Sequence, residues 1–425
     1  MHAQIRFPNS STSNEIRRAL QRVFHQIRTA SLATNTALLF ANTLIGSILG
    51  VTFWVVATRF YTLSAVGLVS AIVAGSTLIA TLSNLGFSAV IIRYLPVAGK
   101  HELHLCAVSS LVPGLLALVA APVLSLFPVA QVVRDLNGPP VVAALIPMVL
   151  VVGMAVMFVQ DAIFIARHQA RLVLLRGIGS ALARFVLLVP CASLDALGLL
   201  TVFTGGVVVS LVLGVSAWRT PRPADTVAPV AIKDMVVYAG TNYASGLLSQ
   251  APQMLYPILI AARVSHAAAG AFNFAWMASA LLTALAPAAA NALLAQLVRT
   301  PTESSHRIRN MIRAIVAVIA VLACLIFIAL YPVAGLLLRE GAGDMRAFLP
   351  LLLVSAVLFT VVRLKSMVLG LRSHLRMLLV FNGVVAFSAV VLPLLLLPHF
   401  GVLGLELGWF LSQLIGALLA LFVKD

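Results

Sequence analysis

The chain has 425 residues, of which 61% are hydrophobic and only 9% are charged. Soluble domains carry about 25% charged residues, so this composition excludes an ordinary soluble enzyme and predicts a polytopic membrane protein. The formal net charge of +16 would suit nucleic acid, but cytoplasmic loops of membrane proteins also collect Lys and Arg. We therefore expect membrane lipids, and no nucleic acid, as partners.

The first segment, residues 1–31, contains no short apolar core followed by a cleavage site, so no cleavable signal is expected. Apolar side chains recur on one helical face between Ile16 and Ile27, with arginines around them. This pattern predicts a basic amphipathic helix on the cytoplasmic leaflet. A poorly ordered basic leader is the alternative.

Twelve apolar segments follow, each long enough to cross a bilayer, which takes about 20 residues. Those of the first half are 32–57, 64–92, 105–127, 141–166, 172–190 and 196–217. Those of the second half are 234–260, 268–297, 311–337, 346–371, 375–397 and 400–423. We predict an all-α polytopic membrane protein with about twelve transmembrane helices in two pseudo-symmetric six-helix lobes. The N-lobe would span 32–217 and the C-lobe 234–425, joined by a cytoplasmic linker at 218–233.

Charge indicates the orientation of these helices. The N-terminal segment, alternate connectors and the C-terminus hold 22 of the 28 Lys and Arg residues. The opposite connectors hold Arg59, Arg134, Arg263, Arg339 and Arg346. Because basic residues accumulate on the cytoplasmic side, both termini are predicted to be cytoplasmic, in a bacterial inner membrane.

A weak internal repeat supports the two lobes. Arg59 precedes Gly67 in the first half, and Arg263 precedes Gly270 in the second. Two parallel halves are a common transporter plan. The two arginines lie at equivalent outer ends of their helices. Each either anchors its helix at the membrane interface or acts as part of a gate.

The seventh segment carries the clearest polar stripe of the sequence. Its members follow helical spacing and are Tyr238, Asn242, Ser245, Ser249, Gln253 and Tyr256. A polar face in a membrane helix contacts either a water-filled cavity or another helix. Two prolines, Pro252 and Pro257, interrupt the same segment, and we favour the cavity. Asn42, Asn84 and Trp276 extend the predicted cavity wall to the first, second and eighth segments.

Cations and acids inside the segments indicate the charge of the substrate. Arg184 lies about 18 Å from the start of its helix, at 1.5 Å per residue, and has no obvious acidic partner. Arg363 is a second candidate, although its side chain can also reach the membrane surface. Asp161 lies at a depth similar to that of Arg176, so these two are expected to form a structural ion pair. The scarcity of membrane acids favours an anionic substrate.

No enzymatic or metal site is expected. Cys106, Cys191 and Cys324 lack the spacing of metal ligands and are expected to be buried, inert thiols. There is no His/Cys/Asp cluster and no carboxylate pair suited to glycosyl transfer. We expect neither a cofactor nor catalysis.

Several motifs resemble the bacterial polysaccharide-biosynthesis flippases of the multidrug, oligosaccharidyl-lipid and polysaccharide exporter superfamily. In the first half they are Gly67, Leu82-Ser83-Asn84-Leu85-Gly86-Phe87 and Ile92-Arg93-Tyr94-Leu95-Pro96. In the second half they are Gln250-Ala251-Pro252-Gln253, Arg263, Ala269-Gly270-Ala271-Phe272 and Ala275-Trp276-Met277. Related sequences often carry a Glu where this chain has Ala295-Gln296-Leu297. The peptidoglycan-precursor flippases typically add two more helices.

The resemblance implies transport of a polyprenyl-pyrophosphate-linked oligosaccharide to the outer leaflet, for lipopolysaccharide, capsule or exopolysaccharide assembly. Arg184 and Arg363 would neutralise the pyrophosphate, and the polar stripe with Tyr238, Tyr256 and Trp276 would meet the sugars. Polysaccharide polymerase and glycosyltransferases are the implied protein partners. A cation-coupled multidrug exporter of the same superfamily is one alternative, and a noncatalytic membrane scaffold of a glycan-assembly complex is another.

Overall fold

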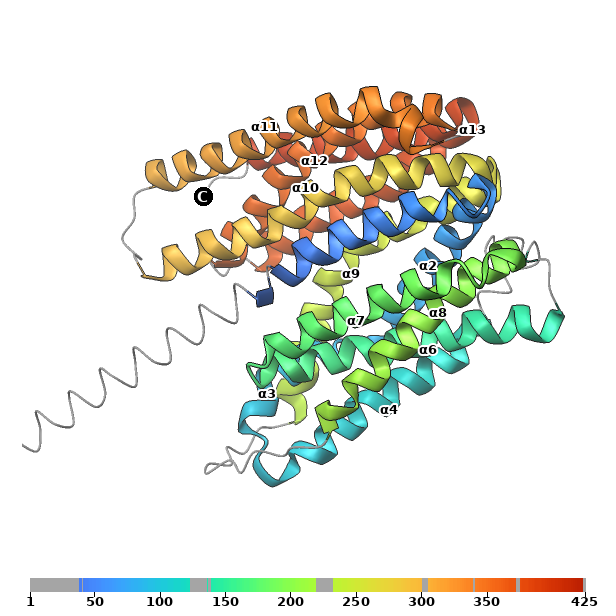
Figure 1. The fold of residues 1–425 in the computed structure, drawn as a ribbon. Helices are drawn as coiled ribbons and strands as arrows, with labels where there is room; N and C mark the ends of the chain where they lie inside the picture. The colour runs from blue at the N-terminus through green and yellow to red at the C-terminus, as the bar shows by residue number, and fades with distance from the viewer. Residues whose placement is uncertain are drawn as a thin grey trace, which may run out of the picture.

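A computed structural model describes residues 38–39, 41–122, 136, 139–218, 232–299, 305–338, 341–371 and 375–422. Within these ranges the chain is helical, with no strand. The expected amphipathic segment 1–31 lies outside the described residues, as does all of the expected linker except Trp218, Ile232 and Lys233. Figure 1 shows two helical lobes side by side.

The N-lobe begins with a first helix, Ala41–Ala57. Its other α-helices are α2 (Leu63–Asn84), α3 (Phe87–Tyr94), α4 (Glu102–Ala120), α6 (Pro140–Ala166), α7 (Ala170–Leu188) and α8 (Asp195–Gly214). The C-lobe consists of α9 (Ile232–Arg263), α10 (His266–Arg299), α11 (Ser305–Leu337), α12 (Ala342–Leu371) and α13 (Leu375–Phe422).

Two breaks distinguish these helices from the predicted segments. The second segment divides into α2 and α3, because Leu85 and Gly86 adopt left-handed φ angles of 46° and 84°. The eleventh and twelfth segments form one element, α13, which is interrupted at Gly401 with φ 58°. Positive φ is unstrained only for glycine, so Gly86 and Gly401 are well suited to these turns.

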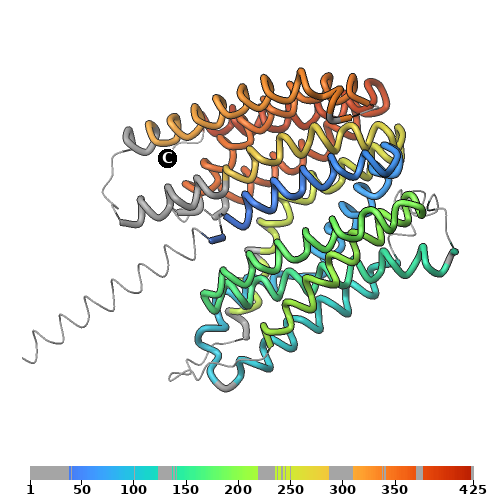
Figure 2. The backbone as a smooth tube through the Cα atoms, in the orientation of Figure 1, coloured from blue at the N-terminus to red at the C-terminus, as the bar shows by residue number. Residues whose placement is uncertain are grey.

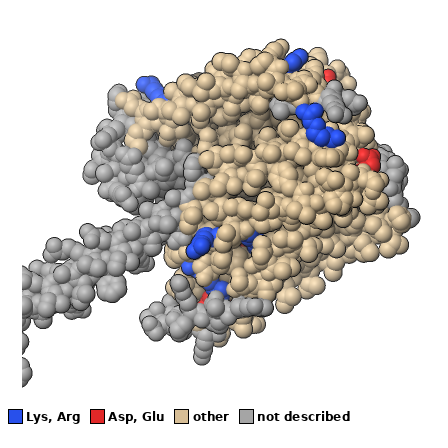
Figure 3. All heavy atoms as spheres, in the orientation of Figure 1, with Lys and Arg blue, Asp and Glu red and all other residues tan. Residues whose placement is uncertain are grey.

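Eight of the described helices are long and apolar enough to cross a membrane. Helix α7 is not among them, and it carries Arg171, Arg176 and Arg184. The Lys, Arg, Asp and Glu side chains visible in Figure 3 lie mainly toward the helix ends, which leaves a broad uncharged belt between them. The fold is therefore that of an all-α polytopic membrane protein.

The two glycines of the sequence repeat meet where the lobes join. Helix α2 packs against α9 and α10 of the C-lobe as well as against α6 of its own lobe. A Cβ atom on Gly67 would overlap the backbone of His266 and Gly270, and a Cβ on Gly270 would overlap Leu63. Only glycine lets the backbones of α2 and α10 approach this closely.

The first helix occupies a special place between the lobes. Figure 2 shows it, in blue, running beside the yellow α10, with the green α7 on its other side. A Cβ on its Gly50 would lie 3.8 Å from Met277 of α10. The helix thus covers one side of the N-lobe while packing on the C-lobe.

A buried ion pair stabilises one end of the N-lobe. Arg167, at the end of α6, lies 2.6 Å from Glu102 of α4, and it also donates to the carbonyl of Ala217 at 2.5 Å. We call this end of the molecule, which also holds Arg93 and the start of α9, the basic end. The other end, which holds Arg59 and Gly401, is the opposite end.

Candidate functional site

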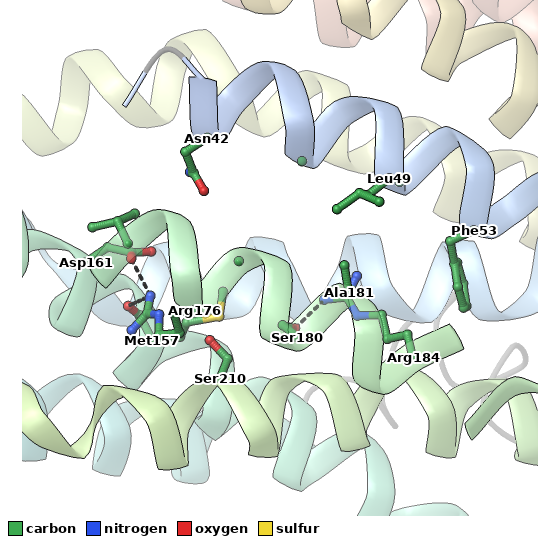
Figure 4. Close-up of a pocket in the computed structure, with 14 residues that line it drawn as sticks. Asn42, Leu49, Phe53, Met157, Asp161, Arg176, Ser180, Ala181, Arg184 and Ser210 are labelled. Atoms are coloured by element: carbon green, nitrogen blue, oxygen red, sulfur yellow. Dashed lines mark hydrogen bonds and ion pairs between the residues drawn. The ribbon is translucent and has the colours of Figure 1, made fainter. Parts of the chain in front are cut away.

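A cavity of about 220 Å³ lies inside the N-lobe, between the first helix and helices α6, α7 and α8. We call it the arginine pocket (Figure 4). Its polar lining residues are Asn42, Asp161, Arg176, Ser180, Arg184 and Ser210. The cavity thus brings together three of the expected site residues on α6 and α7, with Asn42 facing them from the first helix.

Arg184 lies in the arginine pocket and forms no ion pair with any residue that the structure describes. Its Nη2 donates to Ser180 at 3.3 Å, and its guanidinium carbon lies 4.4 Å from the centre of the Phe203 ring. Its Nε is buried and has no hydrogen-bond partner, and none of the described carboxylates pairs with it. A guanidinium has five N–H donors in a fork that matches phosphate. Most of these donors therefore remain available to an anion.

The backbone around Arg184 explains how a long side chain fits between two helices. A Cβ on Gly206 of α8 would lie 2.6 Å from Cγ and Nε of Arg184. The hydroxyl of Ser180 donates to the Gly206 carbonyl at 2.7 Å. Gly206 thus gives the side chain room, and Ser180 joins α7 to α8 beside it.

Arg176, one turn of helix earlier than Ser180, is fully engaged. It forms an ion pair with Asp161, and it donates to Gln160 at 2.9 Å and to the carbonyl of Met157 at 3.2 Å. Its charge is therefore compensated by α6. The difference between a paired Arg176 and an unpaired Arg184 makes Arg184 the anion-binding candidate.

Breaking this pair on one side is expected to destabilise the fold more than removing both charges. Asp161→Asn leaves a buried guanidinium uncompensated, at a cost on the order of 2 kcal/mol, because the Asp161 side chain is partly solvated. Asp161→Asn combined with Arg176→Gln should recover part of that loss. Thermal unfolding of the purified protein measures this double-mutant cycle, and additive losses would contradict the pairing.

A second cavity, of about 270 Å³, lies between the lobes. Its lining comes from the first helix and from α2, α8, α9 and α10. The aromatic and polar residues are Trp54, Ser70, Thr77, Phe203, Gln250, Gln253, Asn273 and Trp276. Two indole rings with carboxamides suit a neutral polyol, since rings cover apolar faces while amides bond to hydroxyls. We call this cavity the inter-lobe cavity.

Aromatic rings separate the two cavities. Phe53, which lines the arginine pocket, lies with its ring centre 5.5 Å from that of Trp54 and 5.4 Å from that of Phe203. The Trp54 and Phe203 rings are 5.2 Å apart. Arg184 of the arginine pocket contacts the Phe203 ring. Its guanidinium therefore lies directly behind the aromatic rings that line the other cavity.

Arg363 and Tyr256 lie apart from both cavities. Arg363 lines a C-lobe space of about 30 Å³ with Pro252, Asn382 and Gln413. That volume suits a water or two rather than a pyrophosphate. Tyr256, which we expected to meet the sugars, is buried against Trp276 and Trp409, and its hydroxyl donates to the Ala389 carbonyl at 2.7 Å. It packs α9 onto α13.

Tyr238 lies at the basic end, in a set of contacts between α9 and the N-lobe that we call a closure. The Arg93 guanidinium lies 4.3 Å from the centre of the Tyr238 ring. Nearby, the Tyr243 hydroxyl donates to the Leu82 carbonyl at 2.9 Å. A Cβ on Gly86 would lie 2.6 Å from the Ala239 carbonyl oxygen. Tyr238 is therefore part of a closure rather than of a cavity.

A second closure, again a set of contacts between the lobes, lies at the opposite end. Arg59 donates to the Leu336 carbonyl of α11 at 2.5 Å, so this residue joins the two lobes. The Gly67 and Gly270 crossing lies at the same end. Arg263 is exposed at the end of α9. Arg59 and Arg263, the two arginines of the sequence repeat, thus occupy different environments.

Three expected site residues remain. Asn84 lies at the break between α2 and α3, and the side chains of Asn242 and Ser249 lie outside the described residues. The Asn84 amide donates to the Ser88 hydroxyl at 3.0 Å and accepts from the Ser88 backbone, so it supports the break between α2 and α3. Reasoning from sequence missed Trp54 and Phe203, because an aromatic residue in an apolar helix looks like core. It noted Arg93 only as a connector cation and a motif residue.

Within the described ranges no group of His, Cys, Asp or Glu is arranged to hold a metal ion. Cys106 is buried, whereas Cys191 is partly exposed and Cys324 is exposed, which corrects the expectation of three buried thiols. Glu406 is fully buried in α13, and no hydrogen bond to its carboxylate is found among the described residues.

Comparison with known proteins gives both a family and a fold. A profile of the family described as Polysaccharide biosynthesis protein matches residues 32–294, more than half of the chain. No curated protein matches the sequence at a significant level.

Solved structures share the fold at low identity. The lipid II flippase MurJ, in an inward closed conformation, has a TM-score of 0.73 at 12% identity, over 91% of this chain and 87% of that one. An inward-facing multidrug resistance MATE transporter has a TM-score of 0.64 at 15% identity, over 91% and 97%. The MATE transporter DinF-BH in complex with R6G has a TM-score of 0.60 at 15% identity, over 92% and 94%.

Proposed function

The chain belongs to the polysaccharide biosynthesis protein family, and from this premise we propose that it flips a polyprenyl-pyrophosphate-linked oligosaccharide across the inner membrane. Its family and its fold are those of the transporters and flippases of the multidrug, oligosaccharidyl-lipid and polysaccharide exporter superfamily. The proposal adds the substrate and the direction, from the cytoplasmic to the outer leaflet.

The observation that carries the substrate class is Arg184 in the arginine pocket, which has no ionic partner in the described part of the chain. A cation deep in a membrane protein is expensive unless it binds something of opposite charge. Asp161, the one acid among the residues lining the three cavities described above, is already paired with Arg176. An anionic head group, such as a pyrophosphate, completes the charge balance.

The inter-lobe cavity supplies the place for the sugars. Trp276 is held by rings on both sides, 5.6 Å from Phe272 and 5.7 Å from Tyr256 between centres. A rigid ring that faces Gln253 and Asn273 presents one apolar surface and several hydrogen-bonding groups. Because the rings of Phe53, Trp54 and Phe203 separate the two cavities, this wall would have to open for one head group to occupy both.

Transport would occur by alternate opening of the two closures. With the basic end in the cytoplasm, release of the Arg93 and Tyr238 contact opens the lobes inward, and release of Arg59 from Leu336 opens them outward. A head group of charge −2 leaving a negative interior gains roughly 4–5 kcal/mol per 100 mV. Because the membrane potential supplies this free energy, the proposed transport requires no coupling ion.

The multidrug exporters are the second candidate, because several share the fold. A cationic drug would meet the unpaired Arg184 in the arginine pocket and no unpaired acid among the residues lining the cavities. The charge of the cavities therefore favours the anionic lipid. A membrane scaffold would have no use for two polar cavities.

Removing the inter-lobe aromatic contact tests the glycan part of the proposal. Trp276→Ala is expected to slow flipping of the glycan-bearing lipid by about tenfold, from loss of roughly 1.4 kcal/mol of ring contact. Flipping of sugar-free polyprenyl pyrophosphate should not change. Trp218→Ala is the matched control, since Trp218 bonds to Ser110 away from the cavity. Equal slowing of both lipids would contradict the assignment.

A further inference from the structure

The small C-lobe space beside Arg363 is the counterpart of the arginine pocket, and we call it the C-lobe pocket. The arginine pocket is lined by the first, fourth, fifth and sixth membrane segments of the N-lobe, which are the first helix, α6, α7 and α8. The C-lobe pocket is lined by the same four segments of its own lobe, which are α9, α12 and the two parts of α13 on either side of Gly401. The chain therefore carries two related cavities, one in each lobe.

Arg363 brings a cation into the C-lobe pocket from α12. It is half-buried and lies eight residues before the end of this helix at Leu371, which is about 12 Å at 1.5 Å per residue. No described residue forms an ion pair with its guanidinium or accepts a hydrogen bond from it. Cations at such a depth in a membrane protein are normally paired. The five N–H donors of Arg363 are therefore available to an anion.

Two carboxamides line the same pocket. The hydroxyl of Ser366 shares its proton between Oδ1 of Asn382, at 2.8 Å, and a carbonyl of the preceding turn, at 3.0 Å. The oxygen of Asn382 is thus occupied, and its amino group, which can only donate, has no acceptor among the described residues. The buried Gln413 donates through Nε2 to the Ser412 hydroxyl at 3.1 Å, and its Oε1 has no hydrogen-bond partner in the described part of the chain.

The rest of the C-lobe pocket is apolar. Phe359 and Trp409 cover it toward the opposite end, with their ring centres 6.1 Å apart. None of the described residues that line it is acidic. Glu406 of α13 lies on the far side of Trp409, about 10 Å along the helix from Gln413. The pocket thus offers a positive charge and N–H donors, and no negative charge.

We propose that the C-lobe pocket binds one monatomic anion of the size of chloride, between the Arg363 guanidinium and the Asn382 amino group. The volume of about 30 Å³ admits guests of the size of water. Chloride is only slightly larger than water, whereas sulfate and pyrophosphate are several times larger. Charge favours the anion over water alone, because water would leave a buried guanidinium uncompensated. A water beside the ion would donate to Oε1 of Gln413.

The bound ion would stabilise the C-lobe. Pro252 of α9 lines the pocket together with α12 and both parts of α13, so one ion would lie where these four segments meet. The site is separate from the arginine pocket and too small for a lipid head group. The inference therefore goes beyond the proposed function and does not depend on it.

Binding of radiolabelled chloride to the full chain tests the site directly. Arg184→Gln is the starting protein, because the arginine pocket could also bind chloride. We expect one saturable chloride per chain, which excess inorganic pyrophosphate does not displace. Adding Arg363→Gln should abolish this binding, and adding Asn382→Leu should weaken it about tenfold, since a hydrogen bond to a charged ligand is lost. Adding Arg346→Gln is the matched control on the same helix, away from the pocket, and should change nothing.

Thermal unfolding gives a second measurement. Replacing gluconate by chloride at constant ionic strength should raise the unfolding temperature of the Arg184→Gln protein until the site is saturated, because a ligand of the folded state stabilises it. Sulfate should not substitute for chloride. The protein that also carries Arg363→Gln should show no such rise.

Absence of saturable chloride binding in the Arg184→Gln protein would overturn the proposal and assign the pocket to water only. Binding that survives Arg363→Gln, or that pyrophosphate displaces, would place the ion elsewhere and would overturn it as well. If the chain with Arg363→Gln does not fold, Asn382→Leu decides, because an unchanged chloride affinity there contradicts the site. None of these outcomes depends on whether the protein flips a lipid.

Discussion

Arg184→Gln is expected to reduce flipping of a polyprenyl-pyrophosphate glycan by about 30-fold or more. The variant removes the unpaired cation of the arginine pocket. Losing one partner of a buried, hydrogen-bonded charge pair costs about 2–5 kcal/mol. Initial rates in reconstituted vesicles, compared at equal amounts of folded protein, measure the loss.

Two controls separate charge from packing in this experiment. Arg184→Lys keeps the charge but not the fork of donors, so it should retain part of the rate. Arg346→Gln removes a half-buried arginine that donates to the Tyr331 carbonyl far from the pocket, so it should behave as wild type. Wild-type flipping by a folded Arg184→Gln protein would contradict the assignment of this residue. Because Arg184 has no described acidic partner, its removal leaves no carboxylate uncompensated.

Gly67→Leu is expected to destabilise the protein and to abolish transport. The new side chain would overlap the backbone of His266 and Gly270, so α2 and α10 must separate at the opposite end. Overpacking of this kind costs about 1–3 kcal/mol, and backbone neighbours cannot move aside as side chains do. Thermal unfolding and the flipping rate measure the two effects.

The matched control for Gly67→Leu is Gly343→Leu, also near the opposite end. A Cβ at Gly343 meets nothing within 4 Å, so this variant should retain wild-type stability and transport. If Gly67→Leu were as stable and as active as Gly343→Leu, the close crossing of α2 and α10 would not be needed for the closed state.

The sequence predicted the helices because membrane helices are long and apolar, and this signal survives without tertiary information. It did not predict the break at Leu85 and Gly86 within the second segment. That break depends on left-handed φ angles and on the approach of Gly86 to Ala239, which lies far along the chain. For the same reason the repeat showed that Gly67 and Gly270 hold equivalent positions in the two halves, but it did not show that their backbones are in contact.

The candidate site was partly predictable. Depth along a helix singled out Arg184 and matched Asp161 with Arg176, because helical rise converts residue number into position. The polar stripe of α9 indicated a lined cavity, but periodicity alone could not show that Gln253 faces it while Tyr256 is buried in the C-lobe. The role of Phe203 depends on contacts with the first helix and with Arg184, which only the fold reveals.

Flipping in proteoliposomes under a clamped membrane potential tests the central claim most directly. The labelled substrate is a polyprenyl-pyrophosphate glycan, and its exposure on the opposite leaflet is followed with time. We predict protein-dependent flipping that accelerates as the potential drives anions outward and that ignores an imposed pH gradient. Absence of flipping with several glycans, together with pH-driven efflux of a cationic dye, would contradict the flippase and favour the drug exporter.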